Sequence, residues 1–397
     1  MSRRNLTLLF LCQLISATGS FSIVMLGGII GSTLSASPSL ATLPVSMMVV
    51  VVAATTVPAT LLMRRIGRKA GFALASGSAA LAVLLAAYAL SIGSFAVFTV
   101  AAGMFGINMA FTQQYRYAAA ESVDPRYTGR AISLVLLGAI GGAMLGPELV
   151  TRGASWIGDV PYAGTLIALA ALYLLQIVLF TLLGPLRGED SKTLPGAGRS
   201  LAQIVRQPVF IVAVLGGVAA YGVMTLIMTA TPLSMHVHDG YSLVDTSRII
   251  RNHVLAMYLP SLVSGFLIER LGTVRMMAAG GVVLLGACIV ALQGHEIIHY
   301  WFSLVLLGVG WNFLYVGGTT LLTKTYTLEE RFRAQAVNEF SVFGASASSS
   351  LLAGVVIHLY GWSTLVLLPL PLLLVTLVGL YRVRHDPRVR SALPQSA

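Results

Sequence analysis

The chain has 397 residues, of which 56% are hydrophobic and only 10% are charged, and its formal net charge is +11. Soluble globular domains carry about 25% charged residues, so this composition excludes a water-soluble protein. The positive charge lies in short connections between apolar runs, which argues against nucleic-acid binding.

Apolar runs of roughly 20 residues follow one another along the chain, and each is long enough to cross a bilayer. The first begins near Leu6 and lacks a small-residue cleavage site, so we interpret it as a retained helix and not a signal peptide. The sequence predicts an all-α membrane protein with an N-terminal six-helix half at 1–184, a cytoplasmic linker at 185–206, a C-terminal six-helix half at 207–385 and a cytoplasmic tail at 386–397. The predicted spans lie near 6–30, 41–62, 70–91, 94–116, 129–152, 163–184, 208–232, 249–268, 273–293, 298–323, 333–359 and 363–382.

Lysine and arginine are concentrated in every second connection between these spans. The intervening connections carry few of them, chiefly Arg152, Arg248 and Arg251. By the positive-inside rule, this alternation predicts a multi-pass protein of a bacterial inner membrane with both termini in the cytoplasm. The cationic connections contain Arg3, Arg4, Arg64, Arg65, Arg68, Lys69, Arg126, Arg130, Arg187, Lys192, Arg270, Arg275, Lys324, Arg331, Arg333 and the arginines of 382–390.

The two halves carry similar features at similar spacing. Met63-Arg-Arg-Ile-Gly67-Arg-Lys69 follows the second span, and Gly265-Phe-Leu-Ile-Glu269-Arg-Leu-Gly272 follows the eighth. About 60 residues after the first segment, Arg130 begins the fifth span, and about 60 residues after the second segment, Arg333 begins the eleventh. Small residues follow both arginines. Equal spacing of like features is typical of a duplicated transporter fold.

These segments resemble the loop signature of the major facilitator superfamily, G-x-x-x-D-[RK]-x-G-[RK]-[RK]. The resemblance implies the fold of that superfamily, with 12 transmembrane helices in two six-helix halves. The first copy has Thr60 and Arg64 where the signature has Gly and Asp, which argues against the usual charge latch in the N-terminal half. The second copy keeps Gly265, Glu269, Arg270 and Gly272, and the first keeps Arg65, Gly67, Arg68 and Lys69.

Two short motifs place soft metal ligands on consecutive spans. Met224 and Met228 are one helical turn apart on the seventh span, and His253 and Met257 are one turn apart on the eighth. Because these spans run in opposite directions, the two pairs come at matched depths in the outer half of the membrane, with their members roughly 6 Å apart along the axis. Thioether and imidazole groups in an apolar setting favour Cu(I), whereas Mg²⁺ and Ca²⁺ favour oxygen ligands. The alternative is that the methionines are ordinary apolar residues, because periodicity alone does not show that both pairs face one cavity.

The pairing of Met224-Thr-Leu-Ile-Met228 with His253-Val-Leu-Ala-Met257 resembles the CcoA-like family of bacterial copper importers, which supports assembly of cbb3-type cytochrome c oxidase. The resemblance covers the whole chain, including Gln114-Tyr-Arg-Tyr-Ala-Ala-Ala-Glu121 and Gly310-Trp-Asn-Phe-Leu-Tyr-Val-Gly-Gly318. It implies that the four motif residues serve copper uptake, with copper as substrate and no cofactor. The partners would be the copper ion, the lipid bilayer, and a copper chaperone or oxidase assembly factor. Close relatives in this family move riboflavin, so only the Met/His motifs indicate copper.

Other candidate residues lie outside the two motifs. Met235, His236 and His238, in the outer connection after the seventh span, are candidates for outer metal capture, although histidines without a metal are also common in loops. The two cysteines, Cys12 and Cys288, are expected to be small core residues.

Ionisable residues also occur at membrane depth. Glu148, Glu339 and Arg116 are candidates for proton coupling or gating. The structural alternative for Arg116 is that it, or Arg130, forms an ion pair with Glu121 that holds the helices together near their cytoplasmic ends.

The sequence contains no G-x-x-x-x-G-K-[ST] or C-x-x-C motif, so we expect a secondary transporter and not an enzyme or a copper pump driven by ATP. The hypothesis is import of copper, as Cu(I), by alternating access of the two halves. A permease for riboflavin or another small organic substrate is one alternative, with Trp311, Asn312 and Tyr115 as substrate-binding groups. A non-transporting membrane receptor or assembly scaffold is the other.

Overall fold

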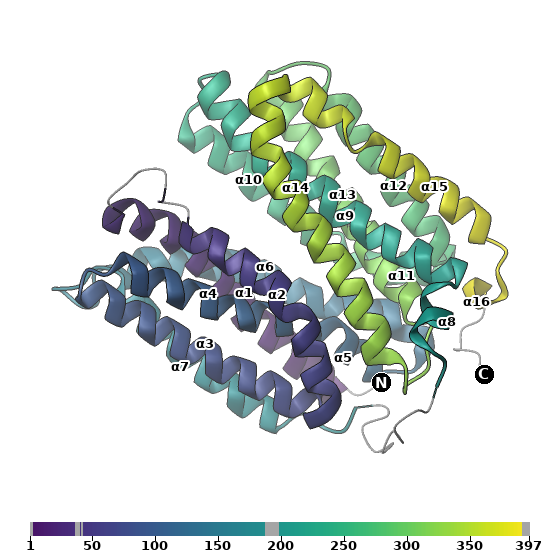
Figure 1. Ribbon diagram of the computed structural model, residues 1–397, viewed down its shortest axis with the longest axis horizontal. Helices are drawn as coiled ribbons and strands as arrows, with labels where there is room; N and C mark the ends of the chain where they lie inside the picture. The colour runs from purple at the N-terminus through teal and green to yellow at the C-terminus, as the bar shows by residue number, and fades with distance from the viewer. Residues whose placement is uncertain (1–2, 36–39, 41–42, 187–197, 391–397) are drawn as a thin grey trace. The chain divides into compact units, whose positions relative to one another are not determined.

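The computed structural model describes residues 3–35, 40, 43–186 and 198–390, which form helices joined by short connections (Figure 1). Within these residues, 11 helical segments are long and apolar enough to cross a membrane. The predicted all-α membrane fold is therefore confirmed. The central stretch 187–197 and the last residues, 391–397, lie outside the described residues, so the boundaries of the halves, linker and tail stay predictions.

Met1–Ser122 and Leu134–Asp190 form one compact unit, the N-terminal unit. Its apolar core includes Phe105 and Tyr173, whose rings meet at a centroid distance of 5.8 Å. The chain from Val123 to Ser133, which contains the short helix η2 (Pro125–Tyr127) and the start of α6, clusters with the other unit. The helices are α1 (Arg3–Leu34), α2 (Leu43–Ile66), α3 (Arg68–Ser91), α4 (Phe95–Thr112), α5 (Tyr115–Glu121), α6 (Thr128–Gly153) and α7 (Ala163–Thr181).

Val123–Ser133 and Ser191–Ala397 form the second compact unit, the C-terminal unit. Helix α13 is central to it and packs against α9, α10, α11 and α12. The helices are α8 (Leu201–Val205), α9 (Pro208–Pro232), the π-helical segment η3 (Leu233–His238), α10 (Leu243–Tyr258), α11 (Ser261–Leu271), α12 (Thr273–Ala291), α13 (Ile297–Leu322), α14 (Arg331–Leu367), α15 (Leu370–Val383) and α16 (Pro387–Arg390).

The two copies of the loop signature have the same backbone conformation at one glycine. Gly67 ends α2 and begins α3 with φ 83° and ψ 161°, and Gly272 ends α11 and begins α12 with φ 87° and ψ 151°. This region of the backbone map is open to glycine and strained for any residue that carries a Cβ atom. The internal repeat predicted from the sequence is thus visible in the structure: the two copies of the signature connect their helices through a glycine of the same conformation.

The predicted eleventh and twelfth spans lie in one apolar segment that is interrupted at Gly361 and again at Leu368 and Pro369, between α14 and α15. The apolar segment Arg331–Val383 has 53 residues. At 1.5 Å per residue it would extend about 80 Å as a straight helix, far more than the hydrocarbon thickness of about 30 Å. At Gly361 the backbone leaves the helical conformation, with φ 76° and ψ 178°. The interruption falls between 333–359 and 363–382, as the two predicted spans require.

The eighth predicted span is also made of two helices. Helix α10 ends at Tyr258 and α11 begins at Ser261, with Leu259 and Pro260 between them. Pro260 has no N–H group and cannot donate the helical hydrogen bond to the carbonyl of the residue four positions before it. The span is therefore broken one residue after Met257.

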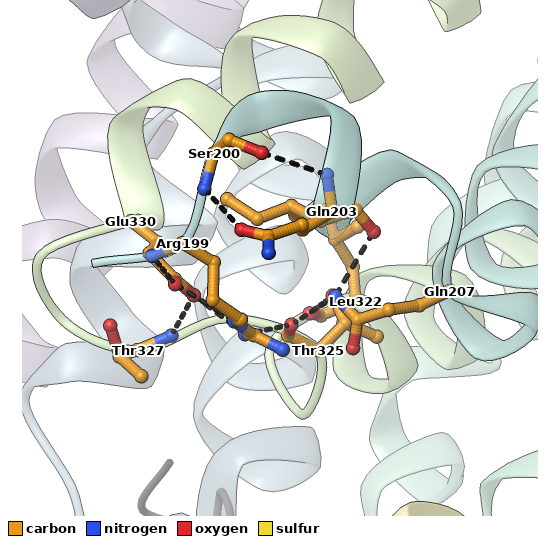
Figure 2. A network of polar contacts seen from close by, with 9 residues as sticks. Arg199, Ser200, Gln203, Gln207, Leu322, Thr325, Thr327 and Glu330 are labelled. Atoms are coloured by element: carbon orange, nitrogen blue, oxygen red, sulfur yellow. Dashed lines mark hydrogen bonds and ion pairs between the residues drawn. The ribbon is translucent and has the colours of Figure 1, made fainter.

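A polar network holds the described end of the linker in the C-terminal unit (Figure 2). Arg199 donates to the Glu330 carboxylate from its backbone N at 2.7 Å, from Nε at 2.9 Å and from Nη2 at 2.6 Å. Arg199 Nη2 and Gln207 Nε2 both donate to the carbonyl oxygen of Thr325, at 2.9 and 3.0 Å. The backbone N–H of Thr327 also donates to Glu330, at 3.0 Å.

Glu330 is fully buried, yet its surroundings favour the charged form. Burial by itself raises the pKa of this carboxyl, but the hydrogen bonds from Arg199 and from the Thr327 N–H outweigh it and lower the pKa to about 2. The hydrogen bonds to Glu330 in turn raise the pKa of Arg199. The described part of the linker is therefore held, through Arg199, by the charged residue that precedes α14.

Candidate metal site in the C-terminal unit

His253 lies on α10 with 1% of its surface exposed. Its Nδ1 atom is 2.8 Å from the backbone carbonyl oxygen of Leu304 on α13. A carbonyl oxygen can only accept, so Nδ1 carries the proton, and in the neutral ring Nε2 presents a lone pair. Nε2 is buried and has no hydrogen-bond partner among the described residues. An imidazole whose N–H is held by a carbonyl and whose other nitrogen is open is the form that binds a metal ion.

Met257 follows His253 by one helical turn and is 7% exposed. Both residues lie against α13 where Gly308 occurs. A Cβ atom at position 308 would lie 2.8 Å from the carbonyl oxygen of His253 and 2.8 Å from the backbone N of Met257. Only glycine therefore permits this close packing. The backbone of the turn from His253 to Met257 lies directly against α13 at Gly308.

Met224 and Met228 are half-buried on α9. They follow Tyr221 by three and seven residues, so the three side chains share one face of the helix. The ring of Tyr221 lies 5.4 Å from the ring of Trp311 on α13 and 5.2 Å from that of Phe343 on α14, as centroid distances. The face of α9 that carries the M-x-x-x-M motif is thus turned toward other helices of the unit.

Trp311 connects the two motif helices. Its ring contacts Tyr221, which precedes Met224, and also Tyr258, which directly follows Met257, at a centroid distance of 5.6 Å. Trp311 therefore lies between α9 and α10, both of which pack against α13. The part of the chain that the structure describes has no group of three or more His, Cys, Asp or Glu residues that could hold a metal, so a metal site here depends on thioether ligands.

The candidates for outer capture occupy different environments. Met235 is fully buried, and its carbonyl oxygen accepts from the backbone N of Tyr241 at 2.9 Å. His238 is exposed, and the side chain of His236 lies outside the described residues. Their capture of copper stays a prediction.

A polar cluster next to these residues was not anticipated. The Tyr300 hydroxyl donates to Asp239 Oδ2 at 2.6 Å, and His295 Nδ1 lies 3.1 Å from the same oxygen. Asp239 and His295 are 56 positions apart in the chain, so no local sequence pattern signals their contact.

The three coupling candidates also differ from one another. Glu148 is exposed and forms an ion pair with Arg152 on the next turn of α6. Arg116 is buried, and its Nη2 atom donates to the Tyr117 hydroxyl at 3.2 Å. Glu339 is fully buried and accepts from Asn338 Nδ2 at 2.9 Å. A coupling or gating role stays a prediction for each.

Glu121, for which Arg116 or Arg130 was the expected partner, forms an ion pair with Arg68 of the first signature copy. Arg68 donates to both oxygens of Glu121, at 2.7 and 2.6 Å, and this pair is almost completely buried. Arg68 Nη1 also donates to Gln114 Oε1 at 3.3 Å, and Gln114 Nε2 donates to Thr60 Oγ1 at 3.4 Å. Thr60, which replaces the signature glycine, is therefore part of a polar chain. In the C-terminal unit, Glu269 of the second signature copy pairs with Arg130.

The residues proposed for an organic substrate are not equally available. The Asn312 amide is bonded within the protein through both its nitrogen and its oxygen. The Tyr115 hydroxyl accepts from Gln176 Nε2 at 3.2 Å. Trp311 Nε1 is buried without a partner among the described residues, so Trp311 is the one of the three with an unused polar atom. Cys12 and Cys288 are buried free thiols, as expected.

The chain matches the model of the Major Facilitator Superfamily over residues 9–259 and again over 253–397. The riboflavin transporter RfnT of Brucella anthropi is 37% identical over 392 residues, which are 98% of each chain. The uncharacterized MFS-type transporter YddS of Bacillus subtilis is 30% identical over 377 residues, 89% of this chain and 85% of that one.

Solved structures agree on the fold. The human organic anion transporter MFSD10 superposes with a TM-score of 0.79 at 14% identity, over 95% of this chain and 99% of that one. The superfamily resemblance predicted from the loop signature is thereby confirmed, and the chain belongs to the Major Facilitator Superfamily of membrane transporters.

Proposed function

We propose that this transporter imports copper, as Cu(I), and that Met224, Met228, His253 and Met257 bind the ion on its way. The observation that carries the proposal is the Nε2 atom of His253, a buried lone pair that has no hydrogen-bond partner in the described part of the chain and belongs to a residue one helical turn before Met257. A buried polar atom without a partner costs free energy and calls for an explanation, and a soft cation would supply one.

The ligand set suits passage of the ion better than permanent binding. Imidazole and thioether groups favour Cu(I) over hard cations. Neutral ligands give weaker binding than the thiolates of copper-storage sites, so the ion can exchange between the α9 and α10 pairs. Water is largely absent from a site as buried as His253 and Met257, which favours a weakly hydrated ion.

Direction and location complete the proposal. We place the chain in a bacterial inner membrane with both termini in the cytoplasm, as the arginine and lysine pattern predicts. A negative-inside potential then favours cation entry by about 2.3 kcal/mol per charge for each 100 mV, so import needs no second ion. Inside, a copper chaperone or an assembly factor of cbb3-type cytochrome c oxidase would receive the ion.

Copper uptake in cells tests the proposal. Cells that lack their own importer and express the wild-type chain should accumulate radioactive copper, and His253→Ala and Met224→Ala should each reduce the rate at least tenfold. Met144→Ala is the matched control, because Met144 is 68% exposed and lies outside both motifs. Unchanged uptake in both motif variants at equal expression would contradict the proposal.

Riboflavin is a second candidate substrate, favoured by a different observation. The chain is 37% identical to a transporter named for riboflavin. In addition, an aromatic cluster offers ring faces and an indole N–H, that of Trp311, which has no partner among the described residues; its members are Trp311, Tyr221, Tyr258, Tyr315 and Phe343. Uptake of radioactive riboflavin that is lost in Trp311→Phe and retained in His253→Ala would favour this candidate over copper.

Reconstitution of the purified protein in liposomes distinguishes a non-transporting receptor or assembly scaffold from a copper transporter and from a riboflavin transporter. Purified protein in liposomes should move copper across the membrane without any partner protein. Binding of copper without flux in that assay would favour the receptor or scaffold.

A further inference from the structure

Three residues on one face of α13 contact the turn of α10 that carries His253 and Met257. They are Leu304, Gly308 and Asn312, which are four residues apart and so lie on one face of the helix. The backbone carbonyl of Leu304 accepts a hydrogen bond from the His253 ring. Gly308 lies against the backbone between His253 and Met257. Asn312 forms the third contact, with Met257 itself.

The Asn312 side chain is fully buried, and it bridges the break between α10 and α11. Its Nδ2 atom donates to the Met257 carbonyl oxygen and to Ser261 Oγ, each at 2.7 Å. Its Oδ1 atom accepts from Ser264 Oγ at 2.6 Å. Both polar atoms of the amide are thus bonded within the protein, which fixes its orientation.

The Met257 carbonyl requires such a donor because of its place in the chain. The last carbonyls of a helix have no helical donor four residues ahead, and α10 ends one residue after Met257. Pro260 removes a further donor at the break. Without the Asn312 amide, the turn that carries Met257 would have a buried, unsatisfied carbonyl and would fray.

We propose that Asn312 is a positioning residue for the metal site, which holds the Met257 turn in place so that the thioether and His253 Nε2 face the ion together. This inference rests on the proposed copper function and adds a residue that does not touch the metal. Groups that orient metal ligands typically contribute about 10- to 100-fold in affinity, so we expect a loss of that size when the amide is removed.

The test is the Cu(I) affinity of the purified full-length protein, measured by competition with a chromogenic Cu(I) chelator. The variants are Asn312→Ala and Asn312→Leu, of which the second keeps the side-chain volume and so remains informative if the first does not fold. Ser303→Ala is the matched control. Ser303 is also fully buried on α13, but its hydroxyl donates to Ala287 of α12 at 3.0 Å, away from α10.

A double-mutant cycle with Met257→Leu distinguishes positioning from general damage. Asn312→Ala should weaken Cu(I) binding about 10- to 100-fold in the wild-type background and less than about threefold when Met257 is already replaced. An equal loss in both backgrounds, or an Asn312 variant with wild-type affinity, would overturn this inference alone, provided that Met257→Leu itself weakens binding. A wild-type protein that binds no Cu(I) would overturn the proposed function and this inference together.

Discussion

The carbonyl oxygen of Leu304 accepts the Nδ1 proton of His253 across 51 positions of the chain. This contact determines that Nε2, and not Nδ1, is the nitrogen available to an ion. It also restrains rotation of the imidazole ring, so the lone pair has a defined direction before any metal arrives. The remaining features of the site can be tested by changes that keep or remove one of these restraints at a time.

Two replacements of Met257 separate metal binding from packing. Met257→Leu keeps the volume of a side chain that is 7% exposed, so it should change the free energy of unfolding by less than about 1.5 kcal/mol while lowering Cu(I) affinity at least tenfold. Met257→Ala should lower the affinity as well and destabilise by about 2 to 5 kcal/mol. Chelator competition and thermal unfolding in detergent measure the two effects. If Met257→Leu binds Cu(I) with wild-type affinity, the Met257 thioether is not a ligand of the ion.

Gly308→Ala should displace α10 from α13. The added methyl group would lie 2.8 Å from three backbone atoms of α10, and backbone cannot yield as a flexible side chain can. We expect a lower thermal midpoint together with weaker Cu(I) binding, because His253 and Met257 move with their helix. Gly354→Ala, on α14, is the control: among the described residues, nothing beyond its own helix backbone lies within 4 Å of the added atom, so stability should be unchanged or rise by up to about 1 kcal/mol. If Gly308→Ala and Gly354→Ala have the same thermal midpoint and the same Cu(I) affinity, the close packing of α10 on α13 at Gly308 does not determine the site.

Much of the architecture could be predicted from local sequence. Runs of apolar residues located the spans, and the gap between the last two predicted spans coincides with Gly361. The repeated signature predicted a duplicated fold, and Gly67 and Gly272 adopt one conformation. Pro260 was a signal that was missed: the eighth span was treated as one helix, although a proline inside a helical pattern indicates a break.

The site could be predicted only as a set of residue types. Helical spacing placed His253 and Met257 on one face, but it could not show which helix that face meets. The contacts that define the site join residues far apart in the chain, such as Met257 with Asn312, 55 positions later. The same is true of Glu121, whose partner Arg68 lies 53 positions earlier. Such pairs depend on how the helices pack, and no periodicity within one span contains that information.

Arg199→Ala should destabilise the C-terminal unit. Glu330 would remain buried with its main cationic partner removed, and breaking a buried ion pair in this way costs about 3 kcal/mol. Thermal unfolding in detergent should show the loss as a lower midpoint. Arg206→Ala is the control, because Arg206 is an exposed cation a few residues later and its removal should have little effect.

The contribution of Glu330 should also depend on pH. Its pKa is lowered from an ordinary value of 4.5 to about 2 in the folded protein, so its stabilising effect is complete above pH of about 4.5 and is lost as the pH falls toward about 2. The difference in thermal midpoint between the wild type and Glu330→Gln should therefore be constant from pH 7 to 5 and shrink below about pH 4.5. A difference that stays constant down to pH 3 would contradict the role given to the charged carboxylate.

Gly361→Ala tests whether one residue makes the last two spans a hairpin. Gly361 has φ 76° and ψ 178°, a conformation that costs a residue with a Cβ atom about 1 to 3 kcal/mol. Apart from the adjacent backbone of its own helix, no atom of the described residues lies within 4 Å of the position that the new methyl group would take, so the expected loss of stability comes from the backbone conformation. Gly354→Ala on the same helix adds the same group in a helical conformation and should not destabilise. If both variants unfold at the wild-type temperature, the turn between the spans tolerates a Cβ atom, and the reversal must be held by the packing of the flanking helices instead.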